Sequence, residues 1–223
     1  MKGIVFSFKK AKLGRKGFRR ITFSDMRYFL KRYGITILFS AVLLFGLASG
    51  SVYAQSSNID LLDSLDFLFT TNLDARLAQN PVGTFCACFA SDFIFLFSVF
   101  LLALTPWGAF IMPFIILFKG FGTGITAGYL FAVHKFAGIG FYLLILLPGT
   151  FLFCAALINF CSKAFVFSKE MLVFAFGKYP PNQTLRSKAV SLSSYFMASL
   201  ILSFLAALID AVLWTLLAGV FNF

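Results

Sequence analysis

One lysine and four glycines interrupt an apolar run in the stretch FKGFGTGITAGYL, residues Phe118–Leu130. A charge inside a membrane-spanning helix is costly, and glycine weakens a helix by roughly 0.5–1 kcal/mol relative to alanine. The folded protein must offset both costs. Two explanations follow from helix geometry: the glycines let a neighbouring helix approach closely, and the lysine pairs with a buried carboxylate.

The composition of the chain is that of a membrane protein. Of its 223 residues, 60% are hydrophobic and 12% are charged, and the mean hydropathy is +0.92. Soluble domains carry about 25% charged residues, so lipid must be the solvent for much of this surface. A helix needs about 20 apolar residues to cross a bilayer, and its backbone must pair internally there. The sequence predicts an all-α bundle of five membrane-spanning helices, at residues 34–54, 85–105, 109–133, 138–160 and 194–220.

The distribution of charge predicts the orientation of this membrane domain, residues 34–223. Residues 1–33 hold eleven of the nineteen Lys and Arg residues, against Asp25 alone. Basic segments stay on the cytoplasmic side and bind anionic lipid, so membrane lipid is an expected partner. With five spans, the N-terminus is inside, the outer loop is 55–84, the inner loop is 161–193, and the C-terminus is outside. Nucleic acid is not an expected partner, because no groove-reading motif accompanies the charge.

The end of the first span allows a second interpretation. Val52-Tyr53-Ala54 resembles a signal-peptidase site with small residues. The basic region before it is longer than in a usual signal peptide, and the apolar run is long enough to span. We therefore expect this segment to remain as a membrane helix.

The glycines are spaced for close helix packing. Gly120, Gly124 and Gly128 recur every four residues and share one face of the third helix, and Gly46 and Gly50 show the same spacing in the first helix. Small residues at this period let helix backbones come close together in lipid. We predict a tight seam, with the first and third helices as its candidates. A helix break that lines a site is the alternative.

Lys119 has two candidate partners inside the membrane. Asp92 lies in the second predicted span and Asp210 in the fifth, and at 1.5 Å of rise per residue all three could reach a similar depth. We predict a buried pair of Lys119 with one of these aspartates. The alternative is that Lys119 extends toward the interface while each aspartate is satisfied locally.

The outer loop carries acidic residues at helical spacing. Asp60, Asp63 and Asp66 fall on one side of a short amphipathic pattern. They could bind a cation or a basic patch of a partner protein, or form a solvated helix face.

Enzymatic chemistry is not expected from this sequence. The chain has four cysteines and a single histidine, His134, which does not form a zinc ligand set. No nucleophile and base occur in a recognisable pattern. We predict no cofactor, no metal and no catalytic residue, and interpret the cysteines as small apolar packing residues.

The central third of the chain resembles the stage II sporulation protein M family. Three features within Met112–Phe160 carry the resemblance. They are the element Phe118-Lys119-Gly120-Phe121, the glycine-rich helix that it opens, and the Leu147-Pro148 step in the next helix. A proline inside a helix implies a kink, so Pro148 is expected to bend the fourth span.

The resemblance implies a role in assembly. It implies a non-enzymatic membrane scaffold of the engulfment machinery, in the engulfing septal membrane of a sporulating bacterium. Its partners would be cell-wall hydrolases of the stage II D and stage II P types. The resemblance leaves open whether the protein also forms a homo-oligomer. The alternative is a permease-like membrane subunit of an ATP-driven transporter, with the inner loop as its coupling surface.

Overall fold

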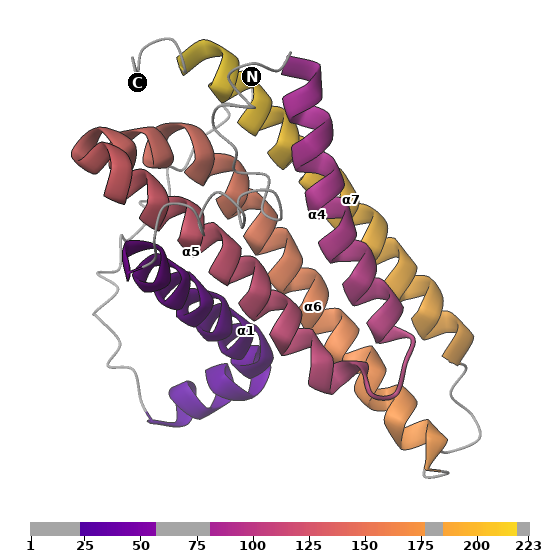
Figure 1. Ribbon diagram of the computed structural model, residues 1–223. Coiled ribbons are helices and arrows are strands. Elements are labelled where there is room, and N and C mark those ends of the chain that lie inside the picture. Colours follow the sequence, from indigo (N-terminus) through magenta and orange to yellow (C-terminus); the bar gives the residue numbers. More distant parts are fainter. Residues whose placement is uncertain (1–22, 57–80, 177–184, 218–223) are drawn as a thin grey trace, which may run out of the picture. The chain divides into compact units, whose positions relative to one another are not determined.

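The computed structural model describes residues 23–56, 81–176 and 185–217, and within these residues it contains helices and turns but no strand. The elements are α1 (Phe23–Ser56), α4 (Pro81–Ala103), α5 (Gly108–Phe141), the π-helical turn η1 (Tyr142–Leu146), α6 (Leu147–Ala175) and α7 (Leu185–Leu217) (Figure 1). Among the described residues, five stretches are long and apolar enough to cross a membrane: Tyr33–Gln55, Pro81–Ala103, Gly108–Ala132, Gly138–Ala175 and Arg186–Leu217. The predicted all-α fold with five spans is confirmed. The orientation, with the N-terminus inside, stays a prediction.

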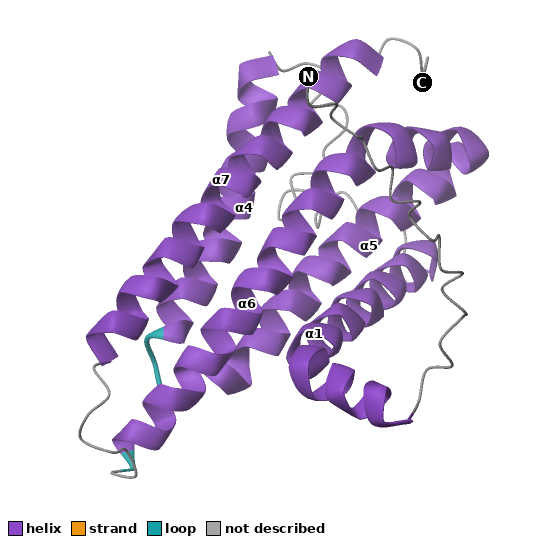
Figure 2. Cartoon of the chain, turned by 180° about the vertical axis from the view of Figure 1, so that it is seen from behind, coloured by secondary structure: helices purple, strands orange, loops and turns teal. Residues whose placement is uncertain are grey.

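The chain divides into two compact units, Met1–Gly34 and Ile35–Phe223. The described part of the first unit is the beginning of α1. The second unit contains the rest of α1 and the other described helices. There α6 packs against α7, α7 also packs against α4, and α5 packs against α6. Figure 2 shows α4 and α7 side by side from the opposite direction.

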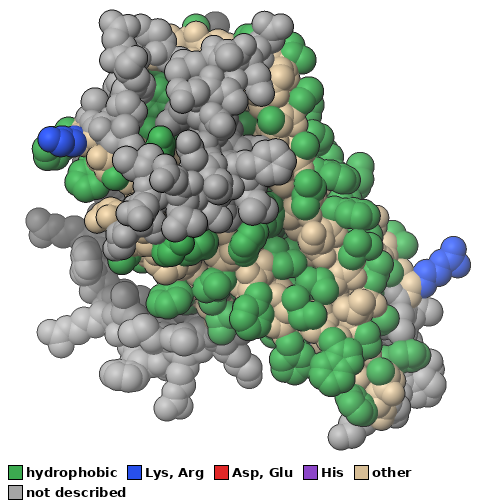
Figure 3. Space-filling model, in the orientation of Figure 1, with side chains coloured by type: hydrophobic (Ala, Val, Ile, Leu, Met, Phe, Trp, Pro, Cys, Tyr) green, Lys and Arg blue, Asp and Glu red, His purple; other side chains and the backbone are tan. Residues whose placement is uncertain are grey.

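All five long helices contribute to one buried apolar core. Phe39 of α1, Leu96 of α4, Ile116 of α5, Phe160 of α6 and Ala206 of α7 belong to a single cluster and are almost fully buried. Large apolar side chains also cover the outside, and Figure 3 shows hydrophobic groups over much of the visible described surface. Such a surface is stable when lipid covers it.

The helices extend beyond the predicted spans. The predicted inner loop at 161–193 is largely helical, because α6 continues to Ala175 and α7 begins at Leu185. The apolar character also continues past the predicted span ends, because the candidate spans run through Ala175 and from Arg186. Lys188 Nζ donates to Glu170 Oε1 at 2.9 Å and joins the two helix ends.

A buried serine of α6 holds the turn between α4 and α5. Ser168 Oγ accepts the N–H of Ala109 at 2.9 Å and donates to the carbonyl oxygen of Thr105 at 2.7 Å. Helix ends leave backbone donors and acceptors without partners inside the helix. One hydroxyl therefore satisfies an acceptor after α4 and a donor at the start of α5. This contact sets where α5 begins relative to α6.

The join between α5 and α6 contains two irregularities. Lys135 has φ 50° and ψ −126°, which breaks the helical path within α5. The turn η1 then precedes Pro148, which has no backbone N–H and cannot donate to the carbonyl four residues earlier. The residue before the proline, Leu147, donates its backbone N–H to the carbonyl oxygen of Tyr142, five residues earlier and not the usual four. The wider turn thus lies where the proline removes a normal helix bond.

Candidate functional site

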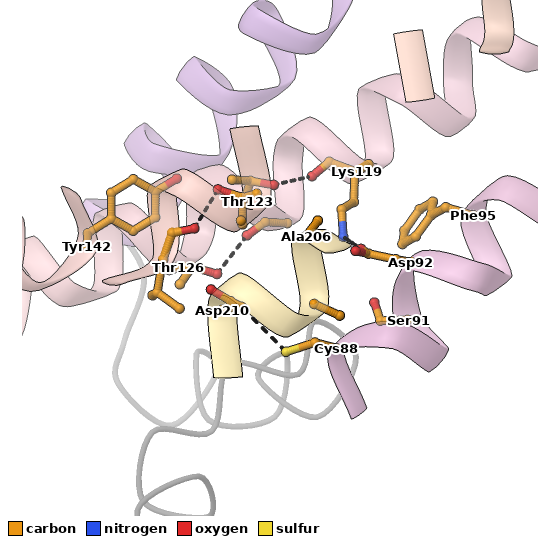
Figure 4. A pocket seen from close by; sticks show the side chains of 15 residues that line it. Cys88, Ser91, Asp92, Phe95, Lys119, Thr123, Thr126, Tyr142, Ala206 and Asp210 are labelled. Atoms are coloured by element: carbon orange, nitrogen blue, oxygen red, sulfur yellow. Dashed lines mark hydrogen bonds and ion pairs between the residues drawn. The ribbon is translucent and has the colours of Figure 1, made fainter. Parts of the chain in front are cut away.

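A polar cavity lies among α4, α5, α6 and α7, toward the end of the bundle where α4 begins and α7 ends. Its volume is about 70 Å³, enough for a few water molecules. Figure 4 shows the side chains of α4, α5 and α7 and that of Tyr142 of η1 around this cavity. The polar side chains that line it are Cys88, Ser91, Asp92, Lys119, Thr123, Thr126, Tyr142, Thr150 and Asp210.

The lysine of the opening stretch lies at this cavity and is paired. Lys119 Nζ is 3.0 Å from Asp92 Oδ1, and the two side chains are only 14% and 12% exposed. The ammonium group also lies 4.9 Å from the ring centre of Phe95 and 4.7 Å from that of Phe153, within the range of cation–π attraction. Of the two candidate carboxylates, the structure brings Asp92 to the lysine. An ion pair and two aromatic faces together offset the cost of a charge in the bundle.

Asp210 lies at another part of the same cavity. It is 7% exposed, and its Oδ2 accepts a hydrogen bond from Cys88 Sγ at 3.4 Å. Gly149 of α6 faces it, and a Cβ added there would lie 3.2 Å from Asp210 and 2.9 Å from the carbonyl oxygen of Ala206. Glycine after Pro148 therefore lets α7 approach α6 at the level of this carboxylate.

Threonines of α5 extend the polar face that Lys119 begins. Thr123 Oγ1 donates to the carbonyl oxygen of Lys119 at 2.9 Å, and Thr126 Oγ1 donates to that of Gly122 at 3.1 Å. Residues 119, 123 and 126 are four and three apart, so they share a helix face. Sequence reasoning missed both threonines, although this spacing was visible. The hydrogen bond from Cys88 to Asp210 also goes beyond the prediction that the cysteines are small apolar packing residues.

The five glycines at helical spacing lie where α1 meets α5. A Cβ added at Gly50 would come within 3.0 Å of the backbone of Phe121, and one at Gly124 within 3.0 Å of the backbone of Leu47. Gly46, Gly120 and Gly128 show the same close approach across these helices. Ser51 Oγ donates to the carbonyl oxygen of Gly124 at 3.1 Å. We call these five glycines the α1–α5 seam.

Other predicted site features lie elsewhere. Asp60, Asp63 and Asp66 lie outside the described residues. Within the described residues, no group of three or more His, Cys, Asp or Glu side chains is arranged to hold a metal ion. The four cysteines are free thiols.

These features define a multi-pass membrane protein with a charged pair inside its helix bundle. The family model of stage II sporulation protein M matches residues 35–213. The chain belongs to the stage II sporulation protein M family, as the resemblance at Met112–Phe160 predicted, and is a sporulation-related membrane protein. That family is not a known enzyme family. Neither the curated proteins nor the solved structures give a match to this chain.

Proposed function

We propose that this protein is a non-enzymatic scaffold of the engulfment machinery, in the engulfing septal membrane, that recruits cell-wall hydrolases of the stage II D and stage II P types. The observation that carries the proposal is the family match over residues 35–213. It includes most of each of the five candidate spans. The proposed activity is therefore assembly, and the chain itself cleaves no bond.

The internal contacts of the bundle support a structural role. Lys119 of α5 binds Asp92 of α4, and Cys88 of α4 binds Asp210 of α7. These contacts link three helices in a region where unpaired polar groups are costly. A bundle fixed in this way could present its ends at constant positions to partner proteins.

The charge distribution supports an assignment of the two membrane faces. The basic segment 1–33 would bind the inner leaflet. The outer loop 55–84, with Asp60, Asp63 and Asp66, would then face the cell wall and contact the hydrolases. Both segments lie largely outside the described residues, so this assignment rests on the sequence.

The test is a mild-detergent pull-down of the tagged protein from its native host, in growth and in starvation, with partners identified by mass spectrometry. We expect cell-wall hydrolases in the starved sample. Neutralising Asp60, Asp63 and Asp66 to Asn should reduce their recovery several-fold, because the proposed contact would lose its charge. The matched control neutralises Lys169 and Arg186 to Gln. Both residues are exposed and lie at the predicted inner face, so this control should leave the recovery of hydrolases unchanged.

One observation favours the alternative, a permease-like subunit of an ATP-driven transporter. It is the polar cavity, because substrate sites of transporters lie within the bundle at about the middle of the membrane. Recovery of a cytoplasmic ATPase in place of hydrolases, lost when Lys169 and Arg186 are neutralised, would overturn the scaffold proposal and support the alternative.

A further inference from the structure

A lysine and a tyrosine meet on the surface where α6 packs against α7. Lys163 Nζ of α6 lies 5.4 Å from the ring centre of Tyr195 of α7, within the range of cation–π attraction. Lys163 is exposed, and Tyr195 is 43% exposed. This contact therefore brings an ammonium group and a phenol hydroxyl close together on the outside of the bundle.

The charge of this lysine is not balanced by a neighbouring acid. Within the part of the chain that the structure describes, no carboxylate pairs with Lys163 and no hydrogen bond occupies the hydroxyl of Tyr195. The nearest carboxylate along α6 and α7 is Glu170, seven residues and therefore about 10 Å from the level of Lys163. Glu170 is already paired with Lys188 at 2.9 Å. The charged residues described at this end of the two helices are Lys163, Lys169, Glu170, Arg186 and Lys188. The surface is therefore positive and complements an anion.

Lys163 lies at the depth expected for lipid headgroups. The candidate span Gly138–Ala175 has 38 residues, about 57 Å of helix, which exceeds the hydrocarbon core of about 30 Å. Its first charged residue, Lys163, follows about 37 Å of helix without charge. Tyrosine is enriched at the same level of the membrane, and Figure 1 shows the end of α6 and the beginning of α7 at the same end of the bundle.

We propose that Lys163 and Tyr195 bind the phosphate of one anionic phospholipid of the phosphatidylglycerol type. The ammonium group and the phenol hydroxyl are both donors, as the phosphate oxygens require, and the basic surroundings select a headgroup with a net negative charge. A zwitterionic headgroup carries a choline cation, which this surface repels. The acyl chains lie along α7 toward the middle of the membrane, where Ile201 and Leu205 are exposed. This site is separate from hydrolase recruitment and does not depend on it.

The test uses the full chain in mild detergent, with three probes at constant pH and ionic strength. The probes are phosphatidylglycerol, phosphatidylcholine with the same acyl chains, and inorganic phosphate. Because a ligand that binds only the folded state stabilises it, we expect phosphatidylglycerol to raise the unfolding temperature saturably by about 3 °C. The other two probes should leave it unchanged. Native mass spectrometry counts the bound lipids, and the wild type should retain one more phosphatidylglycerol than Lys163→Gln.

Two variants and a control assign the response to this site. Lys163→Gln removes the charge at similar length and should weaken phosphatidylglycerol binding at least several-fold. Tyr195→Phe keeps the ring that holds Lys163 and removes the hydroxyl, so it should fold and should also weaken binding several-fold. Lys135→Gln makes the same change at an exposed lysine near the opposite end of the bundle and should bind as the wild type does. A full phosphatidylglycerol response in either variant, or an equal response to phosphatidylcholine or inorganic phosphate, would overturn the proposal.

Discussion

Replacing Lys119 by alanine is expected to reduce the free energy of unfolding by about 3–5 kcal/mol, the usual effect of removing one partner of a buried ion pair. The variant leaves the carboxylate of Asp92, whose side chain is 12% exposed, inside the bundle without the lysine. It also removes the ammonium group from the faces of Phe95 and Phe153. For a chain of this length, the unfolding temperature in detergent should fall by roughly 10 °C.

A double-mutant cycle isolates the pair from these other losses. Asp92→Asn should be strongly destabilising in the wild type and much less so in Lys119→Ala, because the interaction is already absent there. The matched control is the pair Lys188 and Glu170, which is 2.9 Å apart but 35% and 30% exposed. Exposed pairs contribute about 0–1 kcal/mol, so Lys188→Ala with Glu170→Gln should show little coupling. Additive effects at Lys119 and Asp92 would mean that no stabilising pair exists.

Gly124→Ala is expected to be destabilising by about 1–3 kcal/mol, although alanine is the better helix former. An added Cβ at this position would lie within 3.0 Å of the carbonyl oxygen of Leu47. That oxygen belongs to the backbone of α1 and cannot rotate away, so α1 must move off α5. Thermal unfolding in detergent measures the effect.

Gly34→Ala provides the matched control for this substitution. A Cβ added at Gly34 has nothing within 4 Å. The same chemical change should therefore stabilise the helix by about 0.5–1 kcal/mol. The two substitutions are expected to differ in sign. Equal effects at Gly34 and Gly124 would show that the α1–α5 seam is not tightly packed.

The spans and the seam glycines were predictable because both follow from local patterns. Runs of about 20 apolar residues predict helices in lipid, and a spacing of four among Gly120, Gly124 and Gly128 places them on one helix face. The need of Lys119 for a partner also follows from its position in an apolar run. Each of these inferences uses only the sequence within one helix.

The choice between Asp92 and Asp210 was not predictable in this way. Both lie in membrane helices, and which one meets Lys119 depends on how α4 and α7 are rotated about their axes. Packing against several neighbours sets that rotation. The hydrogen bond from Cys88 to Asp210 was not predictable for the same reason. It depends on how α4 packs against α7.

Photo-crosslinking in starved cells of the native host tests the scaffold proposal most directly. A photoreactive amino acid is placed at Lys135, an exposed residue of the turn between the third and fourth spans, or at Trp107, exposed in the turn between α4 and α5. These turns lie near opposite ends of the third span. We expect crosslinks to cell-wall hydrolases from position 135 and none from position 107. Crosslinks to a cytoplasmic ATPase from position 107, with no hydrolase from position 135, would contradict the proposed scaffold.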